Sequence, residues 1–237
     1  MGLSALTAYR GDIVLAKAAE AANVPNIMSG SSLIRLEDVA SVSPRSWFQA
    51  YLPGDDAAIE ALIARVATAG FGTLVITVDT PVAANVERDF SDRGHLNWKH
   101  FAQIRRQWSG TLVVKGIVNA ADARTARDTG ADGIIVSNHG GRQLDGTVSP
   151  LDVLPDVVHA CPDIEIMLDS GVRRGTDVLK ALALGARLVF VGRPFAYAAA
   201  FAGKSQRAIR TRPGSSFRPA ANRRRAPFES RERRPLE

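Results

Sequence analysis

Short apolar runs rich in β-branched residues alternate along the chain with longer segments in which apolar residues recur every three or four positions. The short runs predict strands, and several are apolar almost throughout, as strands buried on both faces are. The predicted strands cover residues 26–29, 46–52, 73–79, 111–115, 133–137, 165–169 and 188–191.

The longer segments predict helices, most of which begin at an Asp, Asn, Thr or Pro residue that favours a helix start. These helices cover residues 12–22, 55–69, 98–107, 120–129, 150–160 and 176–184. Gly70, Gly130 and Gly185 each follow a helix and precede the next strand, where a left-handed helix end favours glycine.

The regular alternation of strand and helix predicts an α/β fold with a parallel sheet and right-handed crossovers. It matches a TIM (β/α)8 barrel, which has eight strands, whereas the pattern supplies seven. We therefore expect a barrel that is incomplete at the first strand, either absent or reduced to a stub at residues 1–3. We also expect an incomplete last helix, which residues 194–203 begin before the composition changes.

Charge separates a barrel domain, residues 1–203, from a tail, residues 204–237. The whole chain has 30 Lys and Arg against 24 Asp and Glu. The tail holds 11 Lys and Arg and 3 Asp and Glu, which gives it a net charge of +8. The domain holds the remaining 19 Lys and Arg and 21 Asp and Glu, which gives it a net charge of −2. The tail is rich in Arg, Pro and Ser without an apolar period, which predicts a disordered basic extension. Because the domain has no positive excess, we expect no specific nucleic-acid partner.

The sequence gives little support to a membrane protein, a secreted protein or a metal-binding protein. No apolar run approaches the roughly 18 residues of a membrane span, and the first residues lack the pattern of a secretory signal. The single cysteine, Cys161, fits a reducing compartment, so we expect a cytoplasmic protein in which Cys161 is a small structural residue. His95, His100 and His159 lack the spacing of metal ligands, and we expect no metal site.

Polar residues gather where the predicted strands end. Because parallel barrels place their active groups at the carboxyl ends of the strands, these residues predict a polar pocket. The residues at these strand ends, two of them glycines, are Ser31, Gln49, Tyr51, Thr77, Asp79, Lys115, Ser137, His139, Asp169, Gly171, Gly192 and Arg193.

Two glycine-rich turns, DSGVRRG after the sixth predicted strand and VGRP after the seventh, predict a phosphate site. Their glycines let backbone N–H groups approach an anion, and Arg173 and Arg193 supply charge-assisted hydrogen bonds. The loops after the last two strands are where barrels commonly hold a cofactor phosphate.

The stretch VSNHGGRQLDG places His139 just beyond a strand and Arg142 three residues later. An imidazole beside a guanidinium suits a carboxylate-bearing substrate from which the histidine removes a proton. Asp79 could hold that imidazole and stabilise its protonated form. Lys115 ends the apolar run LVVK and supplies a cation that would stabilise negative charge on a reduced ring cofactor.

Several segments closely resemble the FMN-dependent α-hydroxy-acid dehydrogenases and oxidases, the family of glycolate oxidase, cytochrome-type L-lactate dehydrogenase and mandelate dehydrogenase. The resemblance is carried by GIIVSNHGGRQLDG, LVVKGI, LDSGVRRGTDVLKALALGA and FVGRPF, and runs from about Gly2 to Gly203. It implies oxidation of an L-2-hydroxy acid, such as L-lactate, to the 2-keto acid, with electrons passing to oxygen, a quinone or a cytochrome. It also implies a homo-oligomer.

The resemblance assigns roles to the pocket residues. His139 would be the base at the substrate α-carbon, Asp79 its partner, and Arg142 the group that binds the carboxylate. Tyr51 would bind the substrate hydroxyl or carboxylate, and Lys115 would lie near the N1 side of the flavin. FMN would be held by Gly2, Ser31, Gln49, Thr77, Lys115, Ser137, Asp169, Gly171, Arg173, Gly192 and Arg193.

Three departures from the family pattern keep other hypotheses open. The family's amino-terminal segment is absent, Val86 stands where members usually have an arginine, and residues 89–97 are short where the family carries a long loop. A second hypothesis is therefore a catalytically impaired remnant that binds FMN weakly or not at all. A third is a nucleic-acid binder that acts through the basic tail. The sequence leaves open the preferred 2-hydroxy acid and the electron acceptor.

The variant Val86→Arg separates the first two hypotheses. A missing charge-assisted contact to the substrate carboxylate costs on the order of 2–5 kcal/mol, so restoring it should raise turnover of L-lactate above that of the original chain. Steady-state rates of the two proteins measure this. An unchanged rate would favour the impaired remnant.

Overall fold

The computed structural model describes residues 2–53, 55–79 and 97–202, and in this part seven strands form one parallel sheet. Each strand pairs with the next one in the chain. The strands are β1 (Ile27–Ser29), β2 (Trp47–Ala50), β3 (Thr73–Thr77), β4 (Thr111–Ile117), β5 (Gly133–Val136), β6 (Glu165–Leu168) and β7 (Leu188–Val189). All seven predicted strands are confirmed. Most of them end one or two residues before the predicted last residue, and only β4 extends beyond it.

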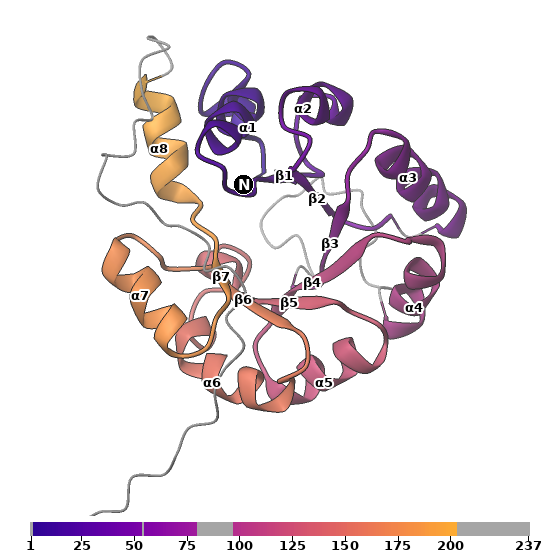
Figure 1. The fold of residues 1–237 in the computed structure, drawn as a ribbon, viewed down its shortest axis with the longest axis vertical. Coiled ribbons are helices and arrows are strands. Elements are labelled where there is room, and N and C mark those ends of the chain that lie inside the picture. Colours follow the sequence, from indigo (N-terminus) through magenta and orange to yellow (C-terminus); the bar gives the residue numbers. More distant parts are fainter. Residues whose placement is uncertain (1, 54, 80–96, 203–237) are drawn as a thin grey trace, which may run out of the picture.

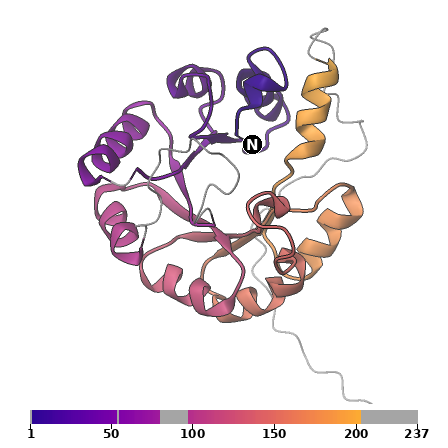
Figure 2. The ribbon, with the colours of Figure 1, turned by 180° about the vertical axis from the view of Figure 1, so that it is seen from behind.

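The helices surround the strands on the outside (Figures 1 and 2). They are α1 (Gly11–Ala21), α2 (Leu36–Val42), α3 (Asp56–Thr68), α4 (Trp98–Gln107), α5 (Ala120–Asp128), α6 (Pro150–Ala160), α7 (Gly175–Ala183) and α8 (Arg193–Ala202), with two 3-10 helices, η1 (Ser4–Leu6) and η2 (His139–Gly141). Helix α2 was not predicted, because its seven residues, LEDVASV, are too few to show a helical period.

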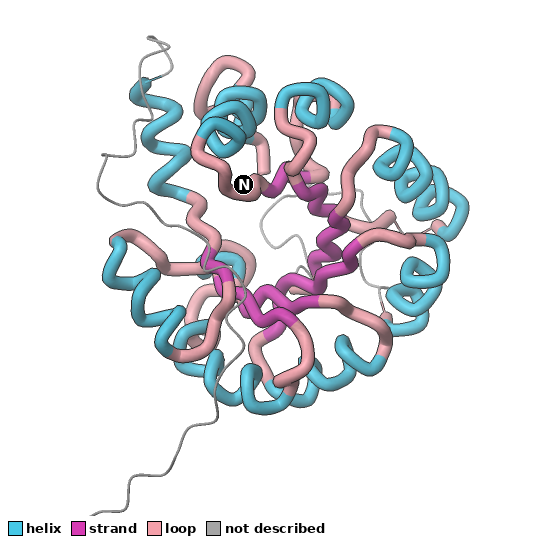
Figure 3. The backbone as a smooth tube through the Cα atoms, in the orientation of Figure 1, coloured by secondary structure: helices cyan, strands magenta, loops and turns pink. Residues whose placement is uncertain are grey.

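The barrel is open on one side, as the strand count predicted. In the described ranges β1 and β7 do not pair with each other, and the strands follow an arc inside the ring of helices (Figure 3). The expected stub strand at residues 1–3 is wrong for the two residues that are described. Gly2 and Leu3 lie in a turn before η1, and Leu3 has a φ of 55°, which an extended strand does not allow. The tail and Val86 lie outside the described residues.

The sheet has an apolar layer on each face, because successive strand residues point to opposite sides. One face packs against the helices and includes Leu74 and Ile76. The other face encloses a separate buried cluster, here called the inner layer, of Val75, Val113, Ile135 and Met167. Trp47 on β2 and Phe190 just past β7 pack against the inner layer with ring centroids 5.3 Å apart. This edge-to-face contact links β2 to the end of β7 across the barrel interior.

The helix ends follow the sequence signals. Gly70, Gly130 and Gly185 have φ values of 89°, 104° and 107°, which confirms the left-handed helix ends.

Cys161, directly after α6, is fully buried, and burial raises the pKa of its thiol, as expected for a structural residue. No helix in the described ranges is long and apolar enough to cross a membrane.

The inner layer should be sensitive to cavities. Ile135→Ala removes a side chain that is 0% exposed, and we expect the free energy of unfolding to fall by about 2–5 kcal/mol in urea titrations. Leu179→Ala, at a position that is 65% exposed on α7, should change it by less than about 0.5 kcal/mol. Equal effects of the two substitutions would contradict the assignment of an inner layer.

Candidate active site

The alternation that builds the inner layer also builds a polar layer above it. Two residues beyond Ile135 and Met167, the same side of the sheet carries Ser137 and Asp169. Thr77 ends β3 in the same way, two residues beyond its inner-layer residue. Thr77 and Ser137 are buried, with 2% and 0% of their surface exposed. The carboxyl ends of the strands therefore present buried polar groups to the barrel mouth, as the sequence predicted.

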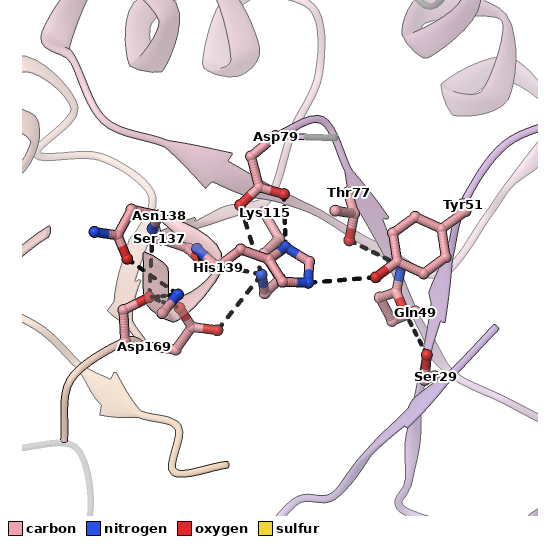
Figure 4. Close-up of polar contacts among 12 residues, drawn as sticks. Ser29, Gln49, Tyr51, Thr77, Asp79, Lys115, Ser137, Asn138, His139 and Asp169 are labelled. Atoms are coloured by element: carbon pink, nitrogen blue, oxygen red, sulfur yellow. Dashed lines mark hydrogen bonds and ion pairs between the residues drawn. The ribbon is translucent and has the colours of Figure 1, made fainter. Parts of the chain in front are cut away.

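The imidazole of His139 lies between side chains from two other strand ends (Figure 4). Its Nδ1 is 2.9 Å from Oδ1 of Asp79, which lies two residues past β3. Its Nε2 is 3.4 Å from the hydroxyl of Tyr51, the residue that follows β2. Because a carboxylate only accepts hydrogen bonds, Nδ1 carries the proton of the neutral imidazole and Nε2 keeps its lone pair. The imidazole is thus held in one orientation by two side chains.

Lys115 joins this base to the neighbouring strand ends (Figure 4). Its Nζ donates to Oγ of Ser137 at 3.0 Å and lies 3.5 Å from Oδ2 of Asp169 and 3.9 Å from Oδ2 of Asp79. The Ser137 Oγ also accepts a hydrogen bond from the backbone N–H of His139 at 3.1 Å. Within the described residues, Oδ2 of Asp79 is buried without a hydrogen-bond partner. The ammonium of Lys115 is therefore the cation nearest to Oδ2 of Asp79, an oxygen to which no described group donates a hydrogen bond.

A bulge in β4 makes room for Asp79. The pairing of β4 with β5 shifts register between Lys115 and Ile117, and Gly116 between them has a φ of 108°. A Cβ atom built on Gly116 would lie 2.5 Å from Cβ of Asp79 and 2.7 Å from its Cγ. Only glycine combines this backbone conformation with so close an approach.

A second hydrogen-bonded chain crosses the first three strands. The hydroxyl of Ser29 donates to Oε1 of Gln49 at 3.1 Å, and Nε2 of Gln49 donates to Oγ1 of Thr77 at 2.9 Å. These bonds connect the carboxyl ends of β1, β2 and β3. Gly2 and Ser31 lie beside this chain, since a Cβ on Gly2 would be 3.6 Å from Oγ of Ser29 and 3.7 Å from Cβ of Ser31.

The turn after β6, which the sequence predicted to bind a phosphate, is open at Gly171. Gly171 has a φ of 74°, and a Cβ built there would meet nothing within 4 Å. The N–H groups of Arg173 and Arg174 donate to the Asp177 carboxylate, both at 2.9 Å, and these bonds lower the pKa of that carboxyl. An anion here would therefore meet the backbone near Gly171 and the exposed side chain of Arg173.

The turn after β7 reaches toward the histidine. Arg193 donates from Nη2 to the carbonyl oxygen of Gly140 at 3.1 Å, so the VGRP turn lies beside the stretch that carries His139. Gly192 precedes it at an exposed position. Arg142, in contrast, is exposed, and its guanidinium has no hydrogen bond or ion pair with any described residue.

Sequence reasoning missed three residues of this site: Ser29, Gly116 and Ser170. Ser29 could have been found from the alternation, because it follows Ile27, which packs on the inner layer, by two residues. Gly116 is the glycine of LVVKGI, but its role depends on a contact with another strand end. Ser170 bonds across to the turn that carries His139, and nothing in the sequence signals this.

A family model described as FMN-dependent dehydrogenase matches residues 1–95 and 90–209. The two matches meet inside the stretch 89–97, where the sequence predicted a shortened loop. The L-lactate oxidase of Lysinibacillus sphaericus (strain C3-41) is 37% identical over 248 residues, which cover 86% of this chain and 64% of that protein. The L-lactate dehydrogenase of Caulobacter sp. (strain K31) is 36% identical over 263 residues, which cover 86% of this chain and 69% of that protein.

The solved structure of mandelate oxidase with (S)-2-phenylpropionate matches with a TM-score of 0.79 and 37% identity, over 87% of this chain and 66% of that one. The chain thus spans about two thirds of the length of these relatives. Both sequence alignments are longer than the 237 residues of this chain, so the relatives carry residues inside the aligned region that this chain lacks.

Gly116→Ala tests the bulge. The added Cβ must displace Asp79, so we expect thermal unfolding at a lower temperature and loss of the hydrogen-bonded Nδ1–H signal of His139 in proton NMR spectra. A left-handed alanine with this clash should cost about 1–3 kcal/mol of stability. Gly72→Ala is the matched control, because a Cβ there meets nothing within 4 Å. A normal His139 signal in Gly116→Ala would contradict the role given to the bulge.

Proposed function

Because the chain belongs to the FMN-dependent dehydrogenase family, we propose that it oxidises an L-2-hydroxy acid, such as L-lactate, to the 2-keto acid with FMN as cofactor. The observation that carries the proposal is the imidazole of His139, held by Asp79 and Tyr51 beside the ammonium of Lys115. The relatives named L-lactate oxidase, L-lactate dehydrogenase and mandelate oxidase support the substrate class.

The polar layer fits a flavin. Gln49 and Thr77 present amide and hydroxyl groups that match the carbonyl and N–H edge of such a ring, and Lys115 adds a positive charge. When bound, FMN supplies the acceptor for the electron pair that leaves the substrate. The residues proposed to hold it are Gly2, Ser31, Gln49, Thr77, Lys115, Ser137 and Asp169 around the ring and ribityl chain, with Gly171, Arg173, Gly192 and Arg193 at the phosphate.

His139 is the proposed base. Its Nε2 takes the proton from C2 of the substrate, while Nδ1–H stays bonded to Asp79 at 2.9 Å. The carboxylate then stabilises the imidazolium that forms, as in other His–Asp pairs. The second proton leaves the substrate hydroxyl for solvent through the hydroxyl of Tyr51, and the electron pair would go to FMN, so that the 2-keto acid has two protons and two electrons fewer than the 2-hydroxy acid.

Tyr51 and Arg142 are the proposed substrate-binding residues. The Tyr51 hydroxyl lies 3.4 Å from Nε2 of His139, so a substrate oxygen bound to it would have its C2 close to the base. Arg142 is exposed beside η2, and its fork of N–H groups matches a carboxylate. The relatives include both an oxidase and dehydrogenases, so the acceptor that reoxidises the flavin is to be found by experiment.

The visible absorption spectrum tests this proposal. The protein is mixed with FMN, desalted, and then treated with L-lactate without air. We expect a retained flavin band that bleaches with L-lactate. His139→Gln should retain the band but bleach at least ~10³-fold more slowly, because it lacks the base.

The other outcomes are equally informative. Retained flavin that neither L-lactate nor L-mandelate bleaches would refute oxidation of these acids. A colourless protein after desalting would favour the impaired remnant. Rates of reoxidation by air, a benzoquinone and cytochrome c identify the electron acceptor.

A further inference from the structure

Ser170, directly after Asp169 at the end of β6, adopts an unusual backbone conformation. Its φ is 80°, in the left-handed region that disfavours residues with a side chain. Such a residue costs of order 1–3 kcal/mol and persists only where its surroundings hold it in place. Gly171, the next residue, shares this conformation and already gives the turn its flexibility. A serine at position 170 therefore calls for an explanation in its side chain.

The hydroxyl of Ser170 makes three hydrogen bonds. It donates to Oδ1 of Asp169 at 2.8 Å and accepts from the backbone N–H groups of Gly140 at 2.9 Å and Asn138 at 3.3 Å. A hydroxyl has one hydrogen to donate and two lone pairs, so these bonds use its full capacity. Ser170 has nothing left with which to bind a ligand.

The two hydrogen bonds that the Ser170 hydroxyl accepts come from the residues on either side of His139. Asn138 and Gly140 flank it, and its own backbone N–H donates to Oγ of Ser137. His139 also has a left-handed φ, 58°. Two hydroxyls, one from the residue directly after β5 and one from the turn after β6, thus hold the three successive N–H groups of residues 138–140.

The hydrogen bond that Ser170 donates to Asp169 connects residues 138–140 to the ammonium of Lys115. Asp169 accepts from Ser170 through Oδ1 and faces Lys115 through Oδ2 at 3.5 Å. Lys115 in turn donates to Ser137, whose oxygen accepts from His139. The bonds form a closed ring that joins the residues proposed to contact the flavin to the segment that carries the proposed base.

We propose that Ser170 is a positioning residue for the reaction. Its hydroxyl fixes the backbone of residues 138–140 relative to Asp169, and so aims Nε2 of His139 at C2 of the substrate. The role in turnover rests on the proposed function. The effect on the orientation of His139 rests on the hydrogen bonds alone and can be measured without any substrate.

Two substitutions separate the hydroxyl from the backbone strain. Ser170→Gly removes the hydroxyl and relieves the left-handed strain, so it should fold. Ser170→Ala removes the hydroxyl and keeps the strain. Ser109→Ala, at an exposed position before β4 and at the opposite end of the sheet, is the matched control.

The first measurement is the NMR signal of the His139 ring in the full chain mixed with FMN, in protein labelled with ¹⁵N at histidine. The chain has four histidines, and the signal lost in His139→Gln identifies the one of interest. In both Ser170 variants we expect the hydrogen-bonded Nδ1–H proton to move upfield and broaden, while Ser109→Ala keeps the original signal.

The second measurement is turnover of L-lactate. We expect kcat to fall about 10- to 100-fold in both Ser170 variants, as for a misplaced catalytic group, while KM and retention of FMN change by less than about threefold. An unchanged His139 signal and kcat in Ser170→Gly, with losses only in Ser170→Ala, would overturn the proposal in favour of a purely conformational role. If the original chain does not turn over L-lactate, the proposed function fails, and the NMR signal alone decides the role of Ser170.

Discussion

The charge of Lys115 is the constraint on which the arrangement of the site depends. The side chains of Lys115 and Asp79 are each only 12% exposed, and that of Asp169 is 21% exposed. Any one of these charges alone would cost several kcal/mol to bury, because it would lose its hydration. One ammonium between two carboxylates offsets most of that cost and leaves a net charge of −1 beside His139. The group that allows both carboxylates to be buried therefore also keeps one of them, Asp79, beside His139.

The position of the site in the sheet follows from the same groups. Tyr51, Asp79, Lys115 and His139 come from the ends of β2 to β5, the central strands of the sheet. The open side of the barrel lies between β1 and β7. The proposed proton-transfer residues are thus supported by paired strands on both sides, whereas the turn after β7, which carries Arg193, borders the opening. The barrel interior remains packed across that opening through Trp47 and Phe190. Whatever completes the barrel should therefore influence the proposed phosphate side more than the base.

The parts that the sequence made predictable are those that repeat along the chain. Apolar runs located every strand, and the alternation along each strand determined which residues face the barrel mouth. The pairing of Asp79 with His139 was also predictable, because parallel strands bring their carboxyl ends to one edge. The unpredicted features depend on single contacts between distant loops. Gly116 is needed because its φ is 108° and because Cβ of Asp79 lies 2.5 Å from where its own Cβ would be. Helix α2 is too short to show a period. The proposed loss of a substrate arginine at Val86 concerns residues that the structure does not describe.

Strain at the site shows how the scaffold and the chemistry are connected. His139 and Ser170 are non-glycine residues in the left-handed region, at the ends of the adjacent strands β5 and β6. The backbone N–H of His139 is bonded to Ser137, and the hydroxyl of Ser170 is bonded to Asp169 and to the backbone of residues 138 and 140. Ser137, which holds His139, is 0% exposed and directly follows the fully buried residues Ile134, Ile135 and Val136. The packing of β5 thus supports His139 in its left-handed conformation. A weaker inner layer would loosen the geometry of His139 before it unfolded the barrel.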